Sequence, residues 1–179
     1  MLKMNDAALV IVDVQGKLAT LMFNRDEFFA NMVKIAQGAW TLGLPILWNE
    51  QLPDKLGPTI PDLKEVLRGM EPMVKNTFSC CDNPTFKSKL KATNCKQVLL
   101  AGMETHVCVY QTAQDLVADG YEVYLVVDAV SSRTMENKLV GVEAMRDLGV
   151  KVTSVEMCLF EMLEVAEGDK FKKIIQIVK

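Results

Sequence analysis

The chain has 179 residues, half of them hydrophobic, with 23 acidic and 20 basic side chains and a net charge of −3 at pH 7. This length suits a single domain over residues 1–179 with a substantial core. No Lys- or Arg-rich run occurs, which leaves nucleic-acid binding without support, and no stretch approaches the roughly 18 apolar residues of a transmembrane helix.

The first half of the chain alternates short apolar runs with helical patterns. Ala8 to Val12 is a continuous apolar run, which predicts a buried strand ended by Asp13. Apolar positions recur at helical spacing from Asp26 to Leu42, and Gly43 ends this predicted helix. The other elements expected here are a strand at 45–48, a proline-rich loop at 50–61, a short helix at 61–68 and a weak strand at 73–74.

The second half continues the same alternation. The expected elements are a helix at 84–92, a strand at 97–101, a helix at 105–118, a strand at 122–127, a helix at 136–148, a strand at 150–154 and two short helical segments at the end. Near-continuous apolar strands that alternate with helices predict an α/β protein with a parallel sheet covered by helices on both faces.

The numbers of cysteines and histidines indicate which disulfides and metal sites the chain can form. Five cysteines without a CxxC pair, and an N-terminus (MLKMNDAALVIVD) without a signal-peptide layout, predict reduced thiols and a cytoplasmic location. The single histidine, His106, removes any multi-histidine metal site. We therefore expect no metal and no cofactor.

Three polar side chains follow predicted strands: Asp13, Lys75 and Cys108. Taken singly, they read as a turn residue, a surface charge and a packing thiol. Because the carboxyl ends of parallel strands meet at one sheet edge, where open α/β folds bind ligands, we expect the three to converge there.

An acid, a cation and a thiol at one edge predict nucleophilic catalysis by Cys108. Its place in the first helical turn favours thiolate, Asp13 can take the thiol proton, and Lys75 can hold the Asp13 charge. Amides between Glu104 and Cys108 can stabilise an oxyanion. On this basis Asp13→Asn is expected to abolish activity and to raise the Cys108 pKa. His106 lies two residues from Cys108, about 200° around a helix, so we expect it to face away.

Five segments carry a family resemblance over essentially the whole chain: ALVIVDVQ, LPILWNEQ, MVKNTFS, VLLAGMETHVCVYQTA and VYLVVDAVSSR. The chain resembles the isochorismatase-like cysteine hydrolase superfamily, and NEQLPDKLGPTIPDL is similar to its isochorismatase-domain-containing subgroup. The resemblance implies a three-layer, Rossmann-like α/β/α sandwich with a six-stranded parallel sheet of order 3-2-1-4-5-6.

The resemblance also implies site residues. It implies Asp13, Lys75 and Cys108 as a catalytic triad, and a cis peptide at Met103–Glu104 that aims the amides of Glu104 and Cys108 into an oxyanion hole. Nicotinamidases of this superfamily carry histidine metal ligands after the second strand, and the corresponding segment here has none.

The expected function is hydrolysis of a small amide through a Cys108 thioester, because siderophore-pathway isochorismatases cleave a vinyl ether without needing the cysteine. A vinyl-ether hydrolase, a catalytically silent interaction protein and, more weakly, a peroxide sensor remain as alternatives. Oligomers are usual in the superfamily, so we expect a homo-oligomer that takes a small-molecule substrate and binds neither nucleic acid nor membrane.

Further residues are candidates for contact with the substrate. Gln15 follows Asp13 closely and can instead be a solvated first-turn residue, whereas Asn49 and Glu50 follow the second strand and can instead close a turn. By analogy with the family, Phe78 is expected in the pocket wall.

Overall fold

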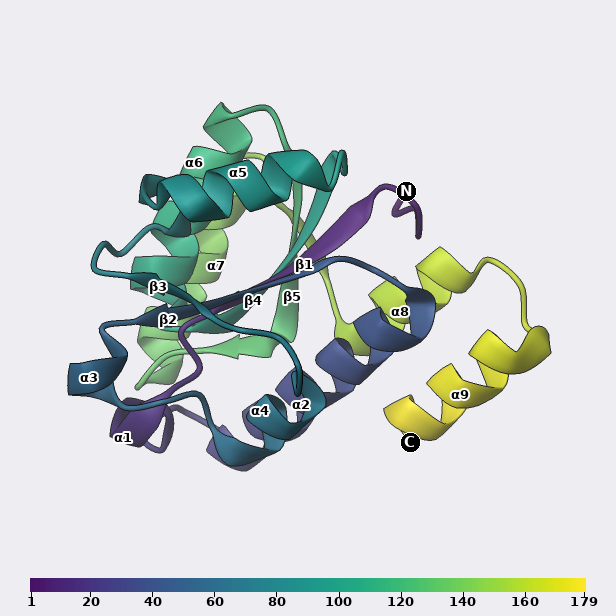
Figure 1. Ribbon diagram of the computed structural model, residues 1–179, viewed down its shortest axis with the longest axis horizontal. Coiled ribbons are helices and arrows are strands. Elements are labelled where there is room, and N and C mark those ends of the chain that lie inside the picture. The colour runs from purple at the N-terminus through teal and green to yellow at the C-terminus, as the bar shows by residue number, and fades with distance from the viewer.

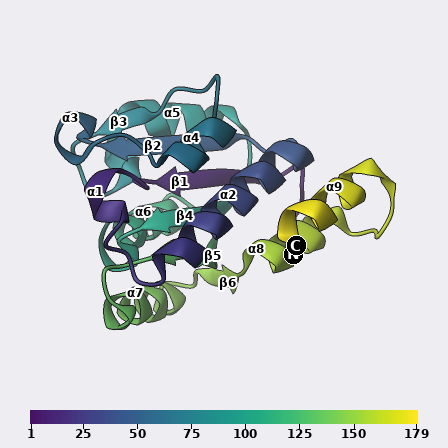
Figure 2. The same cartoon turned by 90° about the horizontal axis from the view of Figure 1, so that it is seen from below.

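Six parallel strands form one sheet in the order β3-β2-β1-β4-β5-β6 in the computed structural model, which describes residues 1–179 (Figure 2). Both the α/β class and the strand order confirm the prediction. The strands are β1 (Ala7–Val12), β2 (Ile46–Gln51), β3 (Met73–Lys75), β4 (Gln97–Met103), β5 (Glu122–Ser131) and β6 (Lys151–Thr153).

Helices cover both faces of this sheet, and the period-two alternation of β1 assigns its side chains to them (Figure 1). Leu9 and Ile11 belong to a core shared with one helical layer, and Val10 and Val12 to a core shared with the other. The first layer contains α2 (Arg25–Leu42), α4 (Pro61–Val66), α8 (Val155–Leu163) and α9 (Gly168–Val178), and the second contains α5 (Pro84–Ala92), α6 (Tyr110–Ala118) and α7 (Met135–Asp147). No helix is both long enough and apolar enough to cross a membrane.

Several strands extend further toward their carboxyl ends than the apolar runs indicate. β4 continues to Met103, and β5 continues to Ser131 past a register shift between Leu100 and Gly102 of β4. Gly102 has φ +147°, and a Cβ there would lie 2.3 Å from the Val12 carbonyl oxygen. Only glycine therefore lets β4 approach β1 this closely at the edge where Asp13 follows.

The expected loop at 50–61 is more ordered than its prolines indicate. It contains the short helix α3 (Pro53–Leu56), and Thr59 forms an antiparallel bridge with Gln15. α3 lies beside α1 (Gly16–Ala19) at the carboxyl edge of the sheet (Figure 1). Pro53 occupies the first position of α3, where a missing N–H costs nothing, so proline here starts a helix rather than preventing one.

Candidate active site

The structure brings Asp13, Lys75 and Cys108 together at the carboxyl edge of the sheet. Asp13 directly follows β1, Lys75 ends β3, and Cys108 lies in the π-helix Thr105–Val109 that follows β4. Asp13 takes φ +54°, and its N–H donates to the Asn49 carbonyl oxygen at 3.2 Å. This left-handed turn leaves the sheet abruptly, and the fold must hold it in place because such a backbone is costly for a residue with a Cβ.

The Lys75 ammonium group donates three hydrogen bonds, all of them to acceptors within the protein. Nζ donates to Asp13 Oδ2 at 2.6 Å, to the Thr77 carbonyl oxygen at 2.9 Å and to the Phe78 carbonyl oxygen at 3.0 Å. The Lys75 side chain is fully buried and that of Asp13 is 4% exposed. Contacts from the protein itself therefore hold the Lys75 ammonium group against Asp13.

The Asp13 carboxylate keeps one oxygen free. Oδ1 is buried and has no hydrogen-bond partner of ordinary geometry. Burial raises the pKa of Asp13 above its usual value, and the Lys75 charge and hydrogen bond offset part of that rise. A carboxylate with a raised pKa and an unpartnered oxygen is suited to accept a proton.

The Cys108 thiol is neutral at rest, contrary to the expectation of a thiolate. Burial, followed by the nearby Asp13 carboxylate, raises its pKa to about 12, and the Lys75 charge lowers it less than these two raise it. The helix-terminus argument is wrong here because desolvation and a like charge outweigh the dipole. Cys108 can attack only if a base removes its proton, and Asp13 is in place to do so.

The turn between β4 and the π-helix differs from the expected one. The Met103–Glu104 peptide is trans, since the chain contains no cis peptide bond. Glu104 instead takes a left-handed conformation with φ 58° and ψ 62°, which together with Gly102 turns the chain between strand and helix. The Glu104 N–H donates to no backbone oxygen, so it remains available to a ligand.

A cavity of about 330 Å³ opens onto these residues. Asp13 and Cys108 line it, and Phe78, which is 53% exposed, forms part of its wall, where the family resemblance places it. The other lining residues are Leu18, Gln51, Leu56, Met103, Glu104, Val107 and Arg133. The cavity thus offers a mostly apolar wall with a thiol and a carboxylate at its base, which is typical of a small-molecule site.

Three candidate substrate contacts hold the protein together and lie outside this cavity lining. Gln15 Nε2 donates to the Gln51 and Gly57 carbonyl oxygens at 2.9 and 2.8 Å, and its Oε1 accepts from the Gln51 N–H at 2.7 Å. Glu50 Oε1 accepts from the N–H and the hydroxyl of Thr59, both at 2.7 Å. Asn49 Nδ2 donates to the Ile11 carbonyl oxygen at 3.1 Å. All three side chains therefore brace the loop after β2 or the neighbouring strand β1.

The sequence did not single out Arg133, which lines the cavity beside Glu104. Arg133 Nε lies 3.0 Å from Glu104 Oε1, and His106 Nδ1 lies 3.1 Å from Ser132 Oγ and 3.5 Å from Glu104 Oε2. His106 thus pairs with groups other than Cys108, as expected. Arg133 lies beyond the expected end of β5, so the sequence pattern held no signal that it would reach the cavity.

The close packing of α7 on the π-helix makes Gly141 a sensitive position. A Cβ at Gly141 would lie 2.8 Å from backbone atoms of Thr105 and His106. We expect Gly141→Ala to push the π-helix away, to lower the free energy of unfolding by about 1–3 kcal/mol and to change the alkylation rate of Cys108. Urea denaturation and thiol alkylation at alkaline pH measure the two effects.

Gly38→Ala is the matched control for this prediction. Its Cβ would meet the Leu159 side chain at 2.5 Å, on the opposite face of the sheet. It should lower stability without changing the alkylation of Cys108. Equal alkylation rates in Gly141→Ala and the wild type would contradict a direct coupling between α7 and the site.

Comparisons with known proteins identify the family to which the chain is related. Residues 7–157 match the family described as "Isochorismatase domain". Isochorismatase domain-containing protein 2 of Danio rerio is 31% identical over 96% of this chain and 86% of its own length. Isochorismatase domain-containing protein 2A of Mus musculus is 37% identical over 84% of this chain and 70% of its own length.

Solved structures show the same fold. MAR1 ribonuclease from Caenorhabditis elegans superposes with a TM-score of 0.92 at 32% identity, over 99% of this chain and 91% of that one. YcaC from Pseudomonas aeruginosa, determined with hexane-2,5-diol and covalent acrylamide, has a TM-score of 0.92 at 28% identity, over 98% of this chain and 90% of that one. YcaC from Escherichia coli, described as an octameric hydrolase of unknown specificity, has a TM-score of 0.93 at 25% identity, over 98% of this chain and 88% of that one. With the family match over most of its length and these relatives, the chain belongs to the isochorismatase family.

Proposed function

We propose that the protein is a cysteine hydrolase that cleaves the C–N bond of a small amide. The observation that carries this proposal is that Cys108 and Asp13, which follow two separate strands, line one cavity, while Lys75 from the end of a third strand holds Asp13 from behind the lining. Because no part of this set is close in sequence, the fold itself must assemble it. We take residues 1–179 as one hydrolase domain, since α8 and α9 pack on the same core as β1.

The first step forms a thioester. Asp13 Oδ1 takes the proton of the Cys108 thiol while Sγ attacks the amide carbon, because the raised thiol pKa leaves almost no thiolate in advance. The carbonyl π electrons move to oxygen, and the N–H groups of Glu104 and Cys108 stabilise the resulting oxyanion. When the tetrahedral intermediate collapses, the C–N bond breaks and the amine leaves with the proton held by Asp13.

The second step releases the acid. Asp13 takes a proton from a water molecule, which attacks the thioester carbon, and the proton then returns to the Cys108 sulfur as the C–S bond breaks. Lys75 stays charged throughout and keeps Asp13 in position. The two steps consume one amide and one water and release one amine and one carboxylic acid.

One relative reacts covalently with a small amide, which is compatible with a nucleophile in a protein of this fold. The P. aeruginosa YcaC structure was determined with covalent acrylamide, a small amide with an electrophilic double bond. The cavity of this chain has the volume for such a small compound. A vinyl-ether hydrolase and a silent interaction protein remain alternatives, and the name of the C. elegans neighbour adds RNA to the substrates to be tested.

A substrate screen tests the proposal. Purified wild-type protein and Cys108→Ala are compared on panels of small amides, esters, vinyl ethers and an RNA oligonucleotide, with amine, acid or fragment release as the readout. We expect turnover of an amide by the wild type alone. Turnover of a vinyl ether by both proteins would overturn the cysteine mechanism, and inactivity of both on every panel, with no acrylamide adduct on Cys108, would favour the silent alternative.

We also propose that the protein is a homo-oligomer. Met135, Leu139 and Val140 of α7 are 37%, 50% and 61% exposed, which is unusual for such apolar side chains on one helix. The E. coli YcaC neighbour is octameric. Light scattering after gel filtration should give a mass above that of one chain, and Leu139→Lys should lower it, whereas a wild-type monomer would contradict the proposal.

Lys75→Met should move the acid limb of the pH–activity profile. Asp13 acts as a base only when deprotonated, so activity is lost as the pH falls through its pKa. The Lys75 charge lowers that pKa, so its removal should raise it. The limb of log kcat/KM should therefore shift to higher pH, while the exposed-lysine control Lys64→Met leaves it in place. An unshifted limb in Lys75→Met would exclude Asp13 as the titrating group.

A further inference from the structure

Charged groups border the cavity at Cys108, and only one of them is open to solvent. The lining contains Asp13, Glu104 and Arg133, and Lys75 holds Asp13 from behind. The side chains of Asp13 and Glu104 are 4% and 9% exposed, whereas that of Arg133 is 55% exposed. Each carboxylate is paired with a cation, so the charge that a ligand can reach in this cavity is the positive charge of Arg133.

Arg133 keeps hydrogen-bond donors free for a ligand. Its Nε donates to Glu104 Oε1 at 3.0 Å, and its side chain makes no other hydrogen bond or ion pair within the chain. A guanidinium group has five N–H donors, so the four on Nη1 and Nη2 are without a partner. Such paired N–H groups match the two oxygens of a carboxylate, which can accept from both nitrogens at once.

The position of Arg133 is fixed by the backbone that leads into it. Ser131 Oγ donates to the Phe23 carbonyl oxygen at 2.7 Å, and the Phe23 N–H donates to the Ser132 carbonyl oxygen at 2.8 Å. Glu104 then holds the guanidinium group itself through Nε. Because backbone and side chain are both held, Arg133 loses little conformational freedom when it binds an anion.

The same cavity offers apolar side chains that a ligand can touch. Phe78 is 53% exposed, and three other apolar lining residues are partly exposed: Leu18, Leu56 and Val107. A short carbon chain can therefore lie in this cavity between the thiol of Cys108 and the cation of Arg133.

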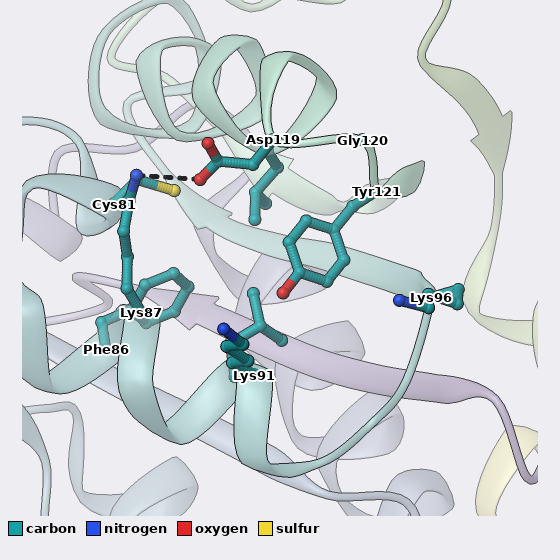
Figure 3. A pocket seen from close by; sticks show the side chains of 10 residues that line it. Cys81, Phe86, Lys87, Lys91, Lys96, Asp119, Gly120 and Tyr121 are labelled. Carbon is teal, nitrogen blue, oxygen red and sulfur yellow. Dashed lines mark ion pairs between the residues drawn. The ribbon is translucent and has the colours of Figure 1, made fainter.

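The cavity between α5 and α6 lacks such a surface. It also has a volume of about 330 Å³, and the one carboxylate in its lining, Asp119, pairs with Lys87 (Figure 3). Three apolar residues of its lining are at most 2% exposed, so no ligand can lie against them: Phe86, Leu90 and Leu116. Of these two cavities, the one at Cys108 thus combines an accessible charge with an accessible apolar wall.

We propose that Arg133 binds a carboxylate of the substrate, and that the amide cleaved at Cys108 is a monoamide of a short dicarboxylic acid. The carboxylate accepts hydrogen bonds from the free guanidinium nitrogens, the carbon chain lies against Phe78, and the amide carbonyl group reaches Cys108. The choice of an amide rests on the proposed hydrolase function, whereas the choice of a carboxylate rests on Arg133.

Pairs of amides that differ only in a terminal carboxylate or methyl group test the assignment by steady-state kinetics. The pairs are succinamate and butanamide, glutaramate and pentanamide, and adipamate and hexanamide, because the chain length sets the reach from Cys108 to Arg133. At the best length, we expect kcat/KM of the acidic amide to exceed that of its neutral partner by about ten- to a hundred-fold, mainly through a lower KM. Arg133→Met should bring this ratio close to one, and Arg133→Lys, which keeps the charge without the paired donors, should restore part of it.

Arg146→Met is the matched control, since it removes the same charge from an exposed position of α7 outside the cavity lining. It should leave the ratio of acidic to neutral amide unchanged. Equal kcat/KM within all three pairs in the wild type, or the same ratio in Arg133→Met as in the wild type, would overturn the proposal.

Calorimetric binding to Cys108→Ala separates this proposal from the hydrolase function, because it requires no turnover. The acidic amide should bind about tenfold or more tightly than its neutral partner, and Arg133→Met introduced into Cys108→Ala should remove the difference. If the wild type hydrolyses no amide, this difference in affinity would still support carboxylate recognition while the hydrolase function fails. Equal affinities of acidic and neutral amides for Cys108→Ala would overturn carboxylate recognition even if the wild type hydrolyses both.

Discussion

Replacing Cys108 with alanine should lower kcat/KM by about a thousand-fold or more on any amide that the wild type hydrolyses. The thioester route needs the sulfur, and no other thiol lines the cavity. The two carbonyl-stabilising amides and Asp13 remain in the variant, so residual activity should be limited to water attack. Steady-state kinetics with amine release, together with mass spectrometry for the missing acrylamide adduct, measure the loss.

Cys95→Ala provides the matched control for that experiment. Cys95 is 6% exposed against 5% for Cys108, yet it lies just before β4 at the other end of the sheet. Both substitutions remove a buried sulfur, so both should lower stability to a similar extent, and only Cys108→Ala should lose turnover. Wild-type rates in Cys108→Ala would show that bond cleavage does not pass through a thioester.

Asp13→Asn should lower turnover by about a hundred- to ten-thousand-fold and, in the same protein, lower the pKa of the Cys108 thiol. The second effect has a definite sign. The negative charge of Asp13 raises the pKa of the Cys108 thiol, and the positive charge of Lys75 lowers it. An uncharged asparagine at position 13 removes the negative charge, while the positive charge of Lys75 stays. The midpoint of Cys108 alkylation should therefore move down from about pH 12. This reverses the expectation from the sequence, which treated Asp13 as a support for the thiolate.

The two readouts of Asp13→Asn separate its chemical role from a structural one. A variant that merely loosens the site would lose turnover through misplacement, and its alkylation would then change together with its stability. Asp82→Asn, an exposed change of equal charge, should alter neither readout. A higher alkylation midpoint in Asp13→Asn, or turnover at the wild-type rate, would contradict Asp13 as the proton acceptor.

The positions of Asp13, Lys75 and Cys108 were predictable because each is set by where an apolar strand ends, a property of the local sequence. The side-chain directions of Gln15 and Glu50 were not, because they depend on how residues 51–59 fold back onto β1 and β2. The neutral state of Cys108 also escaped prediction, since its burial arises from packing among distant segments. The trans peptide before Glu104 corrects an expectation that rested on the resemblance alone.

The position of Arg133 at the cavity could not be predicted from the sequence for a different reason. The apolar pattern of β5 ends near Val127, whereas the strand continues to Ser131 after a register shift against β4. Such a shift depends on the partner strand, so residues beyond it cannot be assigned to a sheet edge from their own sequence. The whole strand order, by contrast, was predictable from the family resemblance.

The three hydrogen bonds of Lys75 tie two properties of the cavity to each other. One bond holds the Asp13 carboxylate, and the other two hold the backbone that carries Phe78, part of the cavity wall. In the proposed mechanism, protonation of Asp13 would weaken the first of these bonds and leave the two backbone bonds in place. A substitution at Lys75 would therefore displace the proposed base and the cavity wall together, so substrate preference and reaction rate should change in the same variant.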